Sequence, residues 1–385
     1  MGKNLKIKKG YKTYKGTKAR DIFEILKKAQ NNITIFAMGG NDTIKVRSGS
    51  NHSIDAGDGS DKFYMYGGKV SKAVLGKGDD VVSVSGGTVK SVNLGTGKNK
   101  ITITGGTVSS ITGSSGVDTI VVSKQKKLNI NSGSGNDKIT VNGIENQRFS
   151  KVSTGKILAG NGNDTITINK GGCYRISGGK GNDTIKIKGG SNYVYGDVGD
   201  DIIFISSKHG GVIDAGQGND KITLSGKGYN YAIVGGDGDD TIYIKNTHST
   251  GYDNYVEGGK GNDVYHVYSV GSYLTINNGA SLATDKDELH IHCPIMDIRS
   301  VNYDCSKDMA VINDRIWIAN FSALSKIVVD SQEFSASEVI GIANPVSCGL
   351  DIGEYLEEYT TNFLKFLNND GITDELAGRI GYAGK

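Results

Sequence analysis

The chain has 385 residues, of which 57 are glycine and only two are proline, and its net charge is +3. The scarcity of proline excludes a collagen-like chain, and a hydrophobic content of 36% excludes a purely flexible glycine-rich linker. The nearly balanced charge gives no reason to expect a nucleic acid or an anionic membrane as partner. No run of about 18 apolar residues occurs, so the sequence predicts no membrane span.

Residues 1–38 are expected to form an N-terminal cap. The segment is basic but lacks the apolar core of a cleavable signal peptide, so any export is expected to follow a route that does not read the N-terminus. Residues 17–30 carry apolar side chains at helical spacing, namely Ile22, Phe23, Leu26 and Ala29. This spacing, after a Thr17 suited to capping, predicts a short amphipathic helix that covers the end of the following fold.

Between residues 39 and 279 an acidic residue recurs about every nineteen positions. The series is Asp42, Asp61, Asp80, Asp118, Asp137, Asp164, Asp183, Asp201, Asp220, Asp240 and Asp263, with Asn99 in the place between Asp80 and Asp118. Large apolar residues follow each member two and four positions later, as Ile44 and Val46 follow Asp42. Residues at this spacing lie on one face of a β-strand.

A second short apolar segment completes each repeat, and Ile54, Val92, Ile111 and Ile176 are examples. Two strands and two glycine-rich turns in about nineteen residues are typical of one coil of a solenoid. A single coil cannot bury its own apolar face, but stacked coils share a continuous narrow core. The sequence therefore predicts an all-β parallel solenoid of about twelve coils.

Glycine-rich loops precede the acidic residues. Three of them read Gly160-Asn161-Gly162-Asn163-Asp164, Gly179-Lys180-Gly181-Asn182-Asp183 and Gly216-Gln217-Gly218-Asn219-Asp220. These loops resemble the RTX (haemolysin-type) calcium-binding nonapeptide, a repeat that forms calcium-binding β-helices. The resemblance implies a right-handed parallel β-roll that binds several Ca²⁺ ions.

The aspartates also favour calcium on physical grounds. Stacking aligns their carboxylates in a column about 5 Å apart, where repulsion costs ~0.8 kcal/mol per neighbouring pair in water and ~3 kcal/mol at an effective dielectric of 20. Ca²⁺ takes six to eight oxygen ligands in flexible geometry, and carboxylates and loop carbonyls supply them. The candidate metal residues are the eleven aspartates of the series with Gly160, Gly162, Gly179, Gly181, Gly216, Gly218, Gly236 and Gly238.

The sequence departs from the RTX pattern because only one of the two turns in each coil carries the motif, so calcium is expected along one edge. Three places are expected to weaken the column. Asn99 lacks a carboxylate, the loop at residues 114–117 has a displaced glycine, and an eight-residue insertion lies between Asp137 and Asp164.

Residues 280–345 alternate apolar and polar residues, which predicts a small β-rich domain of antiparallel strands. Residues 346–385 are expected to form a helical tail, with a helix over 354–367. The RTX resemblance implies that this tail is an uncleaved secretion signal recognised by the type I secretion machinery.

Few other residues suggest chemistry. His290, His292 and Cys293 lie close together, and a transition-metal site there is weighed against ordinary strand positions. Cys173, Cys293, Cys305 and Cys348 show no CxxC spacing, so they are expected to be buried or idle thiols. No HExxH, GxSxG or P-loop motif occurs, so the chain is not expected to be an enzyme.

The leading hypothesis is therefore a secreted calcium-binding β-roll that acts as an extracellular or cell-surface structural or adhesion module. Its partners are expected to be cell-surface glycans or other copies of the chain. The alternatives are a carbohydrate- or ice-binding solenoid and an accessory to a polysaccharide-modifying enzyme. Ice binding requires a regular Thr/Asx ladder beside the calcium edge. Among Ser60, Asp79, Thr96, Asn161, Lys180, Gln217, Asp237 and Lys260, only Thr96 fits.

Overall fold

The fold is taken from a computed structural model of the whole chain. It describes residues 1–8, 12–27, 29, 31–125, 128–143, 155–171, 174–190, 192–207, 210–225, 231–245, 254–269, 273–278, 285–294, 298, 300–305, 307–313, 315–342 and 344–345. The chain divides into two compact units, of which the first ends at Gly190 and the second begins immediately after it. The predicted boundaries after residues 38, 279 and 345 stay predictions.

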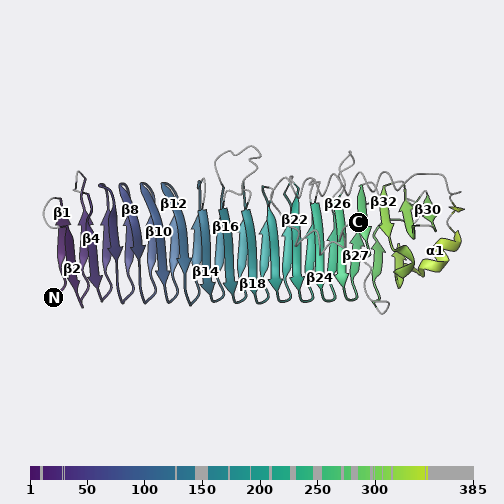
Figure 1. The fold of residues 1–385 in the computed structure, drawn as a ribbon, viewed down its shortest axis with the longest axis horizontal. Helices are drawn as coiled ribbons and strands as arrows, with labels where there is room; N and C mark the ends of the chain where they lie inside the picture. Colours follow the sequence, from purple (N-terminus) through teal and green to yellow (C-terminus); the bar gives the residue numbers. More distant parts are fainter. Residues whose placement is uncertain are drawn as a thin grey trace, which may run out of the picture. The chain divides into compact units, whose positions relative to one another are not determined.

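The coils of the first unit contribute short strands of four residues to one parallel sheet and strands of four to eight residues to a second parallel sheet. The short strands are β1 (Asn4–Ile7), β3 (Ile22–Ile25), β5 (Thr43–Val46), β7 (Lys62–Met65), β9 (Val81–Val84), β11 (Lys100–Ile103), β13 (Thr119–Val122), β15 (Lys138–Val141), β17 (Thr165–Ile168) and β19 (Thr184–Ile187). The second sheet holds β2 (Thr13–Thr17), β4 (Thr34–Met38), β6 (His52–Asp55), β8 (Lys69–Val74), β10 (Thr88–Gly95), β12 (Thr107–Gly113), β14 (Leu128–Ser134), β16 (Gly155–Asn161) and β18 (Tyr174–Lys180). Strands β4, β8, β10 and β12 follow one another in chain order, as Figure 1 shows.

The second unit repeats this arrangement. Its short strands are β21 (Ile202–Ile205), β23 (Lys221–Leu224), β25 (Thr241–Ile244), β27 (Val264–Val267), β29 (Glu288–Ile291) and β33 (Lys326–Val329). The facing sheet holds β20 (Tyr193–Val198), β22 (Gly211–Gln217), β24 (Tyr231–Asp237), β26 (Asn254–Lys260), β28 (Leu274–Asn277) and β32 (Ile316–Ala319). The protein is therefore an all-β parallel solenoid, as the repeat predicts.

The core lies between the two sheets of each coil. Ile44 of β5 stands opposite Phe23 of β3 and Phe63 of β7, and all three side chains are fully buried. The position two residues after each repeat aspartate is buried throughout, up to Tyr265 in the second unit. Because identical positions stack in every coil, the core is one continuous apolar row within each unit.

The prediction of a helix over residues 17–30 is wrong. Residues 22–25 form β3, which pairs in parallel with β1 and β5. Phe23 and Ile25 are buried while Ile22 and Glu24 are half-buried, which is the alternation of a strand. The helical spacing of the apolar residues is outweighed by the adjacent coil, whose edge supplies hydrogen bonds and a core for a strand.

The chain after residue 285 mixes both pairing directions. Strands β29, β32 and β33 continue the parallel sheets of the second unit. Antiparallel pairs join β30 (Val301–Asp304) to β31 (Met309–Ile312), β31 to β32, and β33 to β34 (Gln332–Phe334). The antiparallel strands expected from the sequence are thus present, but the solenoid also reaches further than its repeat indicates.

Three short elements complete the described chain. They are the 3-10 helix η2 (Phe321–Ala323), the helix α1 (Ala336–Ile342) and the strand β35 (Asn344–Pro345). Helix α1 begins with a capping box, in which the Ser335 N–H donates to Glu338 Oε2 at 2.7 Å and the Glu338 N–H donates to Ser335 Oγ at 3.2 Å. In the part of the chain that the structure describes, no helix is long and apolar enough to cross a membrane. The tail at 346–385, with its predicted helix, lies outside the described residues.

Candidate metal centre

The repeat aspartates form a hydrogen-bonded ladder along one edge of each unit. Within each unit, the main-chain N–H of one member donates to Oδ1 of the next: in the first unit Asp42 to Asp61 at 2.6 Å, Asp61 to Asp80 at 2.7 Å and Asp164 to Asp183 at 2.7 Å. In the second unit the same bond runs from Asp201 to Asp220 and from Asp220 to Asp240, both at 2.7 Å, and from Asp240 to Asp263 at 2.9 Å. The 27-residue step from Asp137 to Asp164 does not interrupt the ladder, because the Asp137 N–H donates to Asp164 Oδ1 at 2.6 Å.

The second carboxylate oxygen defines the chemistry of this edge. Oδ2 is buried and has no hydrogen-bond partner among the described residues in Asp42, Asp61, Asp80, Asp137, Asp164, Asp220, Asp240 and Asp263. These residues are at most 2% exposed. A buried charged oxygen without a partner is costly, so the ladder has an unmet demand for a proton or a cation.

Burial raises the pKa of these carboxyl groups, and neighbouring carboxylates add to the effect in most of them. The pKa rises to about 7 in Asp61, Asp164 and Asp263, and to about 8 in Asp240. Asp42 and Asp118 rise less, to about 6. Near pH 7 these carboxyl groups are therefore close to their own pKa, so a bound cation can replace their protons.

The loop main chain is packed tightly against the ladder, which explains the glycines. Gly160 and Gly162 have φ of 115° and 125°, and Cβ atoms there would overlap the carbonyl oxygens of Gly133 and Gly135. Gly179, Gly181, Gly216, Gly218, Gly236 and Gly238 also have positive φ. At Gly235 and Gly258 a Cβ would overlap Oδ2 of Asp240 and Asp263 respectively. The predicted loop glycines thus allow neighbouring loops to stack closely, and their role as calcium ligands stays a prediction.

The donor set consists of oxygen atoms, which suits a hard cation such as Ca²⁺. Among the described residues no three His, Cys, Asp or Glu side chains gather into a group that could hold a metal ion. Side chains alone therefore do not complete a calcium shell, and loop carbonyl oxygens have to contribute. With that contribution the residues fit calcium, and the assignment of individual ligands remains a proposal.

Asn99 is the one amide in the ladder. Its Oδ1 accepts the Asp80 N–H at 3.0 Å, while its Nδ2 donates to the Gly97 carbonyl at 3.4 Å. The amide thus preserves the ladder and also engages the Gly97 carbonyl in the loop that precedes it. The neighbouring loop at residues 114–117 keeps its main-chain bond, from the Gly116 N–H to the Ser134 carbonyl at 2.9 Å. The expected weakness of this region stays a prediction.

Sequence reasoning missed two members of the ladder. The Asp21 N–H donates to Asp42 Oδ1 at 2.6 Å, and Asp287 Oδ1 accepts the Asp263 N–H at 2.7 Å. Both residues carry the signal of the repeat, since Phe23 and Ile25 follow Asp21, and Leu289 and Ile291 follow Asp287, all buried. The absence of the glycine loop before these aspartates hid the match.

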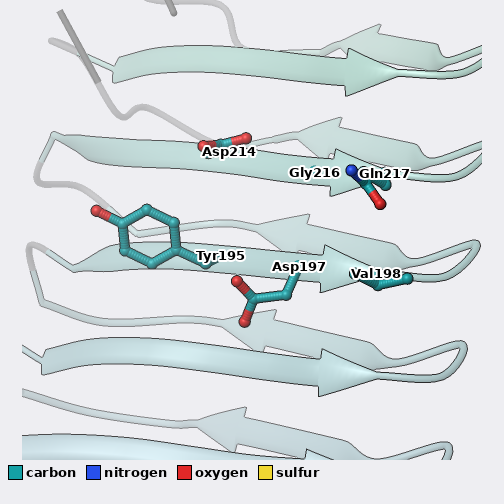
Figure 2. Close-up of a pocket in the computed structure, with 6 residues that line it drawn as sticks. All are labelled: Tyr195, Asp197, Val198, Asp214, Gly216 and Gln217. Atoms are coloured by element: carbon teal, nitrogen blue, oxygen red, sulfur yellow. The ribbon is translucent and has the colours of Figure 1, made fainter. Parts of the chain in front are cut away.

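Two further features concern chemistry outside the ladder. A cavity of about 140 Å³ in the second unit is lined by Tyr195, Asp197 and Val198 of β20 and by Asp214, Gly216 and Gln217 of β22 (Figure 2). This volume is well below that of typical ligand pockets. Of the thiols expected to be buried or idle, Cys305 is exposed and Cys293 is half-buried, and their being idle stays a prediction. Cys173 and Cys348 lie outside the described residues.

Comparison with known proteins agrees with the loop chemistry. Residues 175–203, 228–243 and 248–266 match the family model described as the RTX calcium-binding nonapeptide repeat (4 copies), so these segments carry RTX calcium-binding repeats. No curated protein sequence resembles the chain closely enough to count as a match. Among solved structures the chain is similar to a hyperactive, Ca²⁺-dependent, β-helical antifreeze protein from an Antarctic bacterium. The two are 19% identical, with a TM-score of 0.48, and the alignment covers 86% of this chain and 94% of the other.

Proposed function

We propose that this calcium-binding RTX solenoid is a secreted, non-enzymatic protein that folds when it meets Ca²⁺ outside the cell and then acts as a structural or adhesion module. The observation that carries the proposal is the row of buried Oδ2 atoms in Asp42, Asp61, Asp80, Asp137, Asp164, Asp220, Asp240 and Asp263, which have no hydrogen-bond partner among the described residues. Bound Ca²⁺ would supply positive charge between neighbouring loops. The carboxylates Asp42 to Asp183 in the first unit and Asp201 to Asp263 in the second would hold it, together with loop carbonyls.

The ladder makes folding depend on the calcium concentration. Without a cation the fold has to bury these carboxyl groups as protonated acids or as unpaired charges, and both disfavour folding near neutral pH. Extracellular calcium modules bind with Kd of about 10⁻⁴–10⁻³ M. At a hundredfold excess over Kd, each site stabilises the fold by about 2.7 kcal/mol. Cytosolic calcium would leave such a chain largely unfolded and fit for export through a type I secretion channel.

A calcium titration followed by far-UV circular dichroism tests this proposal. We expect a β-sheet spectrum to appear at millimolar Ca²⁺ and not at the same concentration of Mg²⁺, which demands stricter octahedral geometry. The same spectrum and melting temperature in excess chelator at pH 7.5 would refute calcium-dependent folding. Secretion is tested separately, by deleting residues 346–385 and measuring export.

The ice-binding alternative has less support from the loop edge. The residues between the two loop glycines include charged pairs, with Lys77 Nζ 3.7 Å from Asp58 Oδ2 and Lys260 Nζ 2.9 Å from Asp237 Oδ1. These ion pairs interrupt the uniform Thr/Asx array that ice binding requires. We therefore expect no thermal hysteresis from the calcium-loaded protein. Binding to surface glycans and self-association remain proposals for its partner.

A further inference from the structure

The outer face of the second unit carries a cluster of aromatic rings that are not part of the aspartate ladder. Tyr243 of β25, His266 of β27 and His290 of β29 stand opposite one another in register across adjacent strands. A second row, beyond the strand ends, contains Tyr268 and His292. Two of the histidine rings stack on tyrosines. The ring centroids of His266 and Tyr243 are 4.5 Å apart, and those of His292 and Tyr268 are 4.3 Å apart.

The two rows meet at a pair of imidazole nitrogens. Nδ1 of His266 lies 2.9 Å from Nε2 of His292, so that one neutral ring donates a hydrogen bond to the other. Zinc–nitrogen bonds of 2.0–2.1 Å at a tetrahedral angle require two nitrogens about 3.3 Å apart. The pair is therefore close to the spacing of a chelating pair, and replacing the shared proton by a metal ion requires the nitrogens to separate by about 0.4 Å and both rings to turn so that their lone pairs meet at the ion.

We propose that His266 and His292 bind a divalent transition-metal ion of the Zn²⁺ class, with water completing its coordination shell. Imidazole nitrogen suits Zn²⁺, Ni²⁺ and Cu²⁺ and does not suit Ca²⁺, so this site differs in chemistry from the ladder. Two side chains suffice for a weak, open site, which agrees with the absence of a three-residue metal group among the described residues.

Stacking holds both ligand rings in place. The planes of the His266 and Tyr243 rings are 13° apart, and those of the His292 and Tyr268 rings are 10° apart. The tyrosine stacks hold both rings upright on the sheet, which limits the reorganisation that binding requires.

Nearby charges partly balance one another. Lys245 Nζ lies 4.8 Å from the Tyr268 ring centroid, and Lys221 Nζ lies 5.0 Å from that of Tyr243, so both ammonium groups oppose a second cation. Glu288 Oε2 lies 2.8 Å from His290 Nε2 and 3.1 Å from Lys326 Nζ, which is also 3.8 Å from Glu333 Oε1, so a third ammonium group offsets part of this negative charge. Asp330 and Glu333 line the cleft of about 550 Å³ that also borders His292. This cleft gives solvent and metal ions access to His292.

The test is a zinc titration by isothermal calorimetry on the full chain, kept folded in saturating Ca²⁺ at pH 7.5. We expect one Zn²⁺ per chain, and we expect His266→Phe and His292→Phe, which preserve the ring stacks, each to weaken binding by at least about tenfold. His290→Gln and Tyr243→Phe are the matched controls and should leave the affinity unchanged.

An independent readout covers variants that fold poorly. In the unmodified chain, zinc should shift the imidazole ¹⁵N resonances of His266 and His292 more than those of His52, whereas added Mg²⁺ should shift none of them. Unchanged zinc affinity in both phenylalanine variants would overturn the assignment. So would a loss in His290→Gln as large as theirs. Neither result bears on calcium-dependent folding, which the chelator experiment decides.

Discussion

Replacing Asp240 by asparagine separates the two roles of a ladder residue. Asp240 Oδ1 accepts the Asp220 N–H at 2.7 Å, and an asparagine Oδ1 can accept the same bond. Oδ2 is buried without a hydrogen-bond partner among the described residues, and this is the atom whose charge the substitution removes. Asn99 shows that an amide fits the ladder, since it accepts the Asp80 N–H in the same way.

Without calcium the substitution should stabilise the fold. Burial, together with the neighbouring carboxylates, raises the pKa of Asp240 from its ordinary 3.8 to about 8. At pH 7 this difference disfavours the folded chain by at most on the order of 4 kcal/mol, because the unfolded carboxyl group is ionised and the folded one is not. Asp240→Asn removes this penalty, so the midpoint of unfolding in chelator should rise.

With calcium the sign reverses. The variant loses one negative ligand of the loop edge, and calcium affinity depends on ligand charge, so we expect the calcium midpoint to rise by about tenfold. Asp240→Ala is the matched control, because it also leaves the buried Asp220 N–H without an acceptor at a cost of about 1–3 kcal/mol. That variant should be less stable than Asp240→Asn under both conditions.

The assay is urea unfolding followed by circular dichroism, in excess chelator and in saturating Ca²⁺, at pH 7. The expected result is an increase in the free energy of unfolding in chelator and a decrease in calcium. If Asp240→Asn lowered the free energy of unfolding equally in both, the carboxylate would be a structural hydrogen-bond acceptor and not a charge awaiting a cation.

Three further predictions concern the same edge. First, the calcium-free protein should gain stability as the pH falls from 8 towards 4. The folded pKa of Asp61, Asp164 and Asp240 lies at about 7 to 8, above the ordinary 3.8, so the folded chain binds more protons than the unfolded chain in this range. Thermal melts in chelator measure this gain. Second, Asn99→Asp should lower the calcium midpoint, since it restores a carboxylate and releases the Gly97 carbonyl, as calorimetry would show. Third, Gly162→Ala should destabilise the calcium-loaded protein by on the order of 1–3 kcal/mol. The φ of 125° at Gly162 and the neighbouring Gly135 carbonyl leave no room for a Cβ. Calorimetric melts would measure the loss.

Each of these has a direct control. Stability that rises with pH in chelator would contradict the buried-acid account of the ladder. For Asn99 the control is Asn99→Ala, which should not tighten calcium binding; equal tightening would show that removal of the amide, not the new charge, is responsible. Ser60→Ala, on an exposed loop residue, is the control for Gly162→Ala, and an equally small loss in both would remove the steric argument.

The sequence by itself determined the repeating part of this protein. An aspartate followed at two and four positions by apolar residues, as in Asp42, Ile44 and Val46, specifies a strand and the turn before it. Each coil is stacked on a copy of itself, so a local pattern becomes a tertiary one with no further information. The oxygen chemistry of the ladder follows for the same reason, because equivalent side chains must align.

Only the tertiary structure decided how the ends of the pattern behave and which side chains meet on the outer faces. Residues 22–25 have apolar residues that suit a helix as well as a strand, and pairing with β5 selects the strand. The neutral histidine pair joins residues 26 positions apart, in a stretch where the repeat has lost its regular step. Whether a buried oxygen finds a donor depends on packing in three dimensions, so the Oδ2 atoms that lack a partner in the described part of the chain could be seen only in the folded protein.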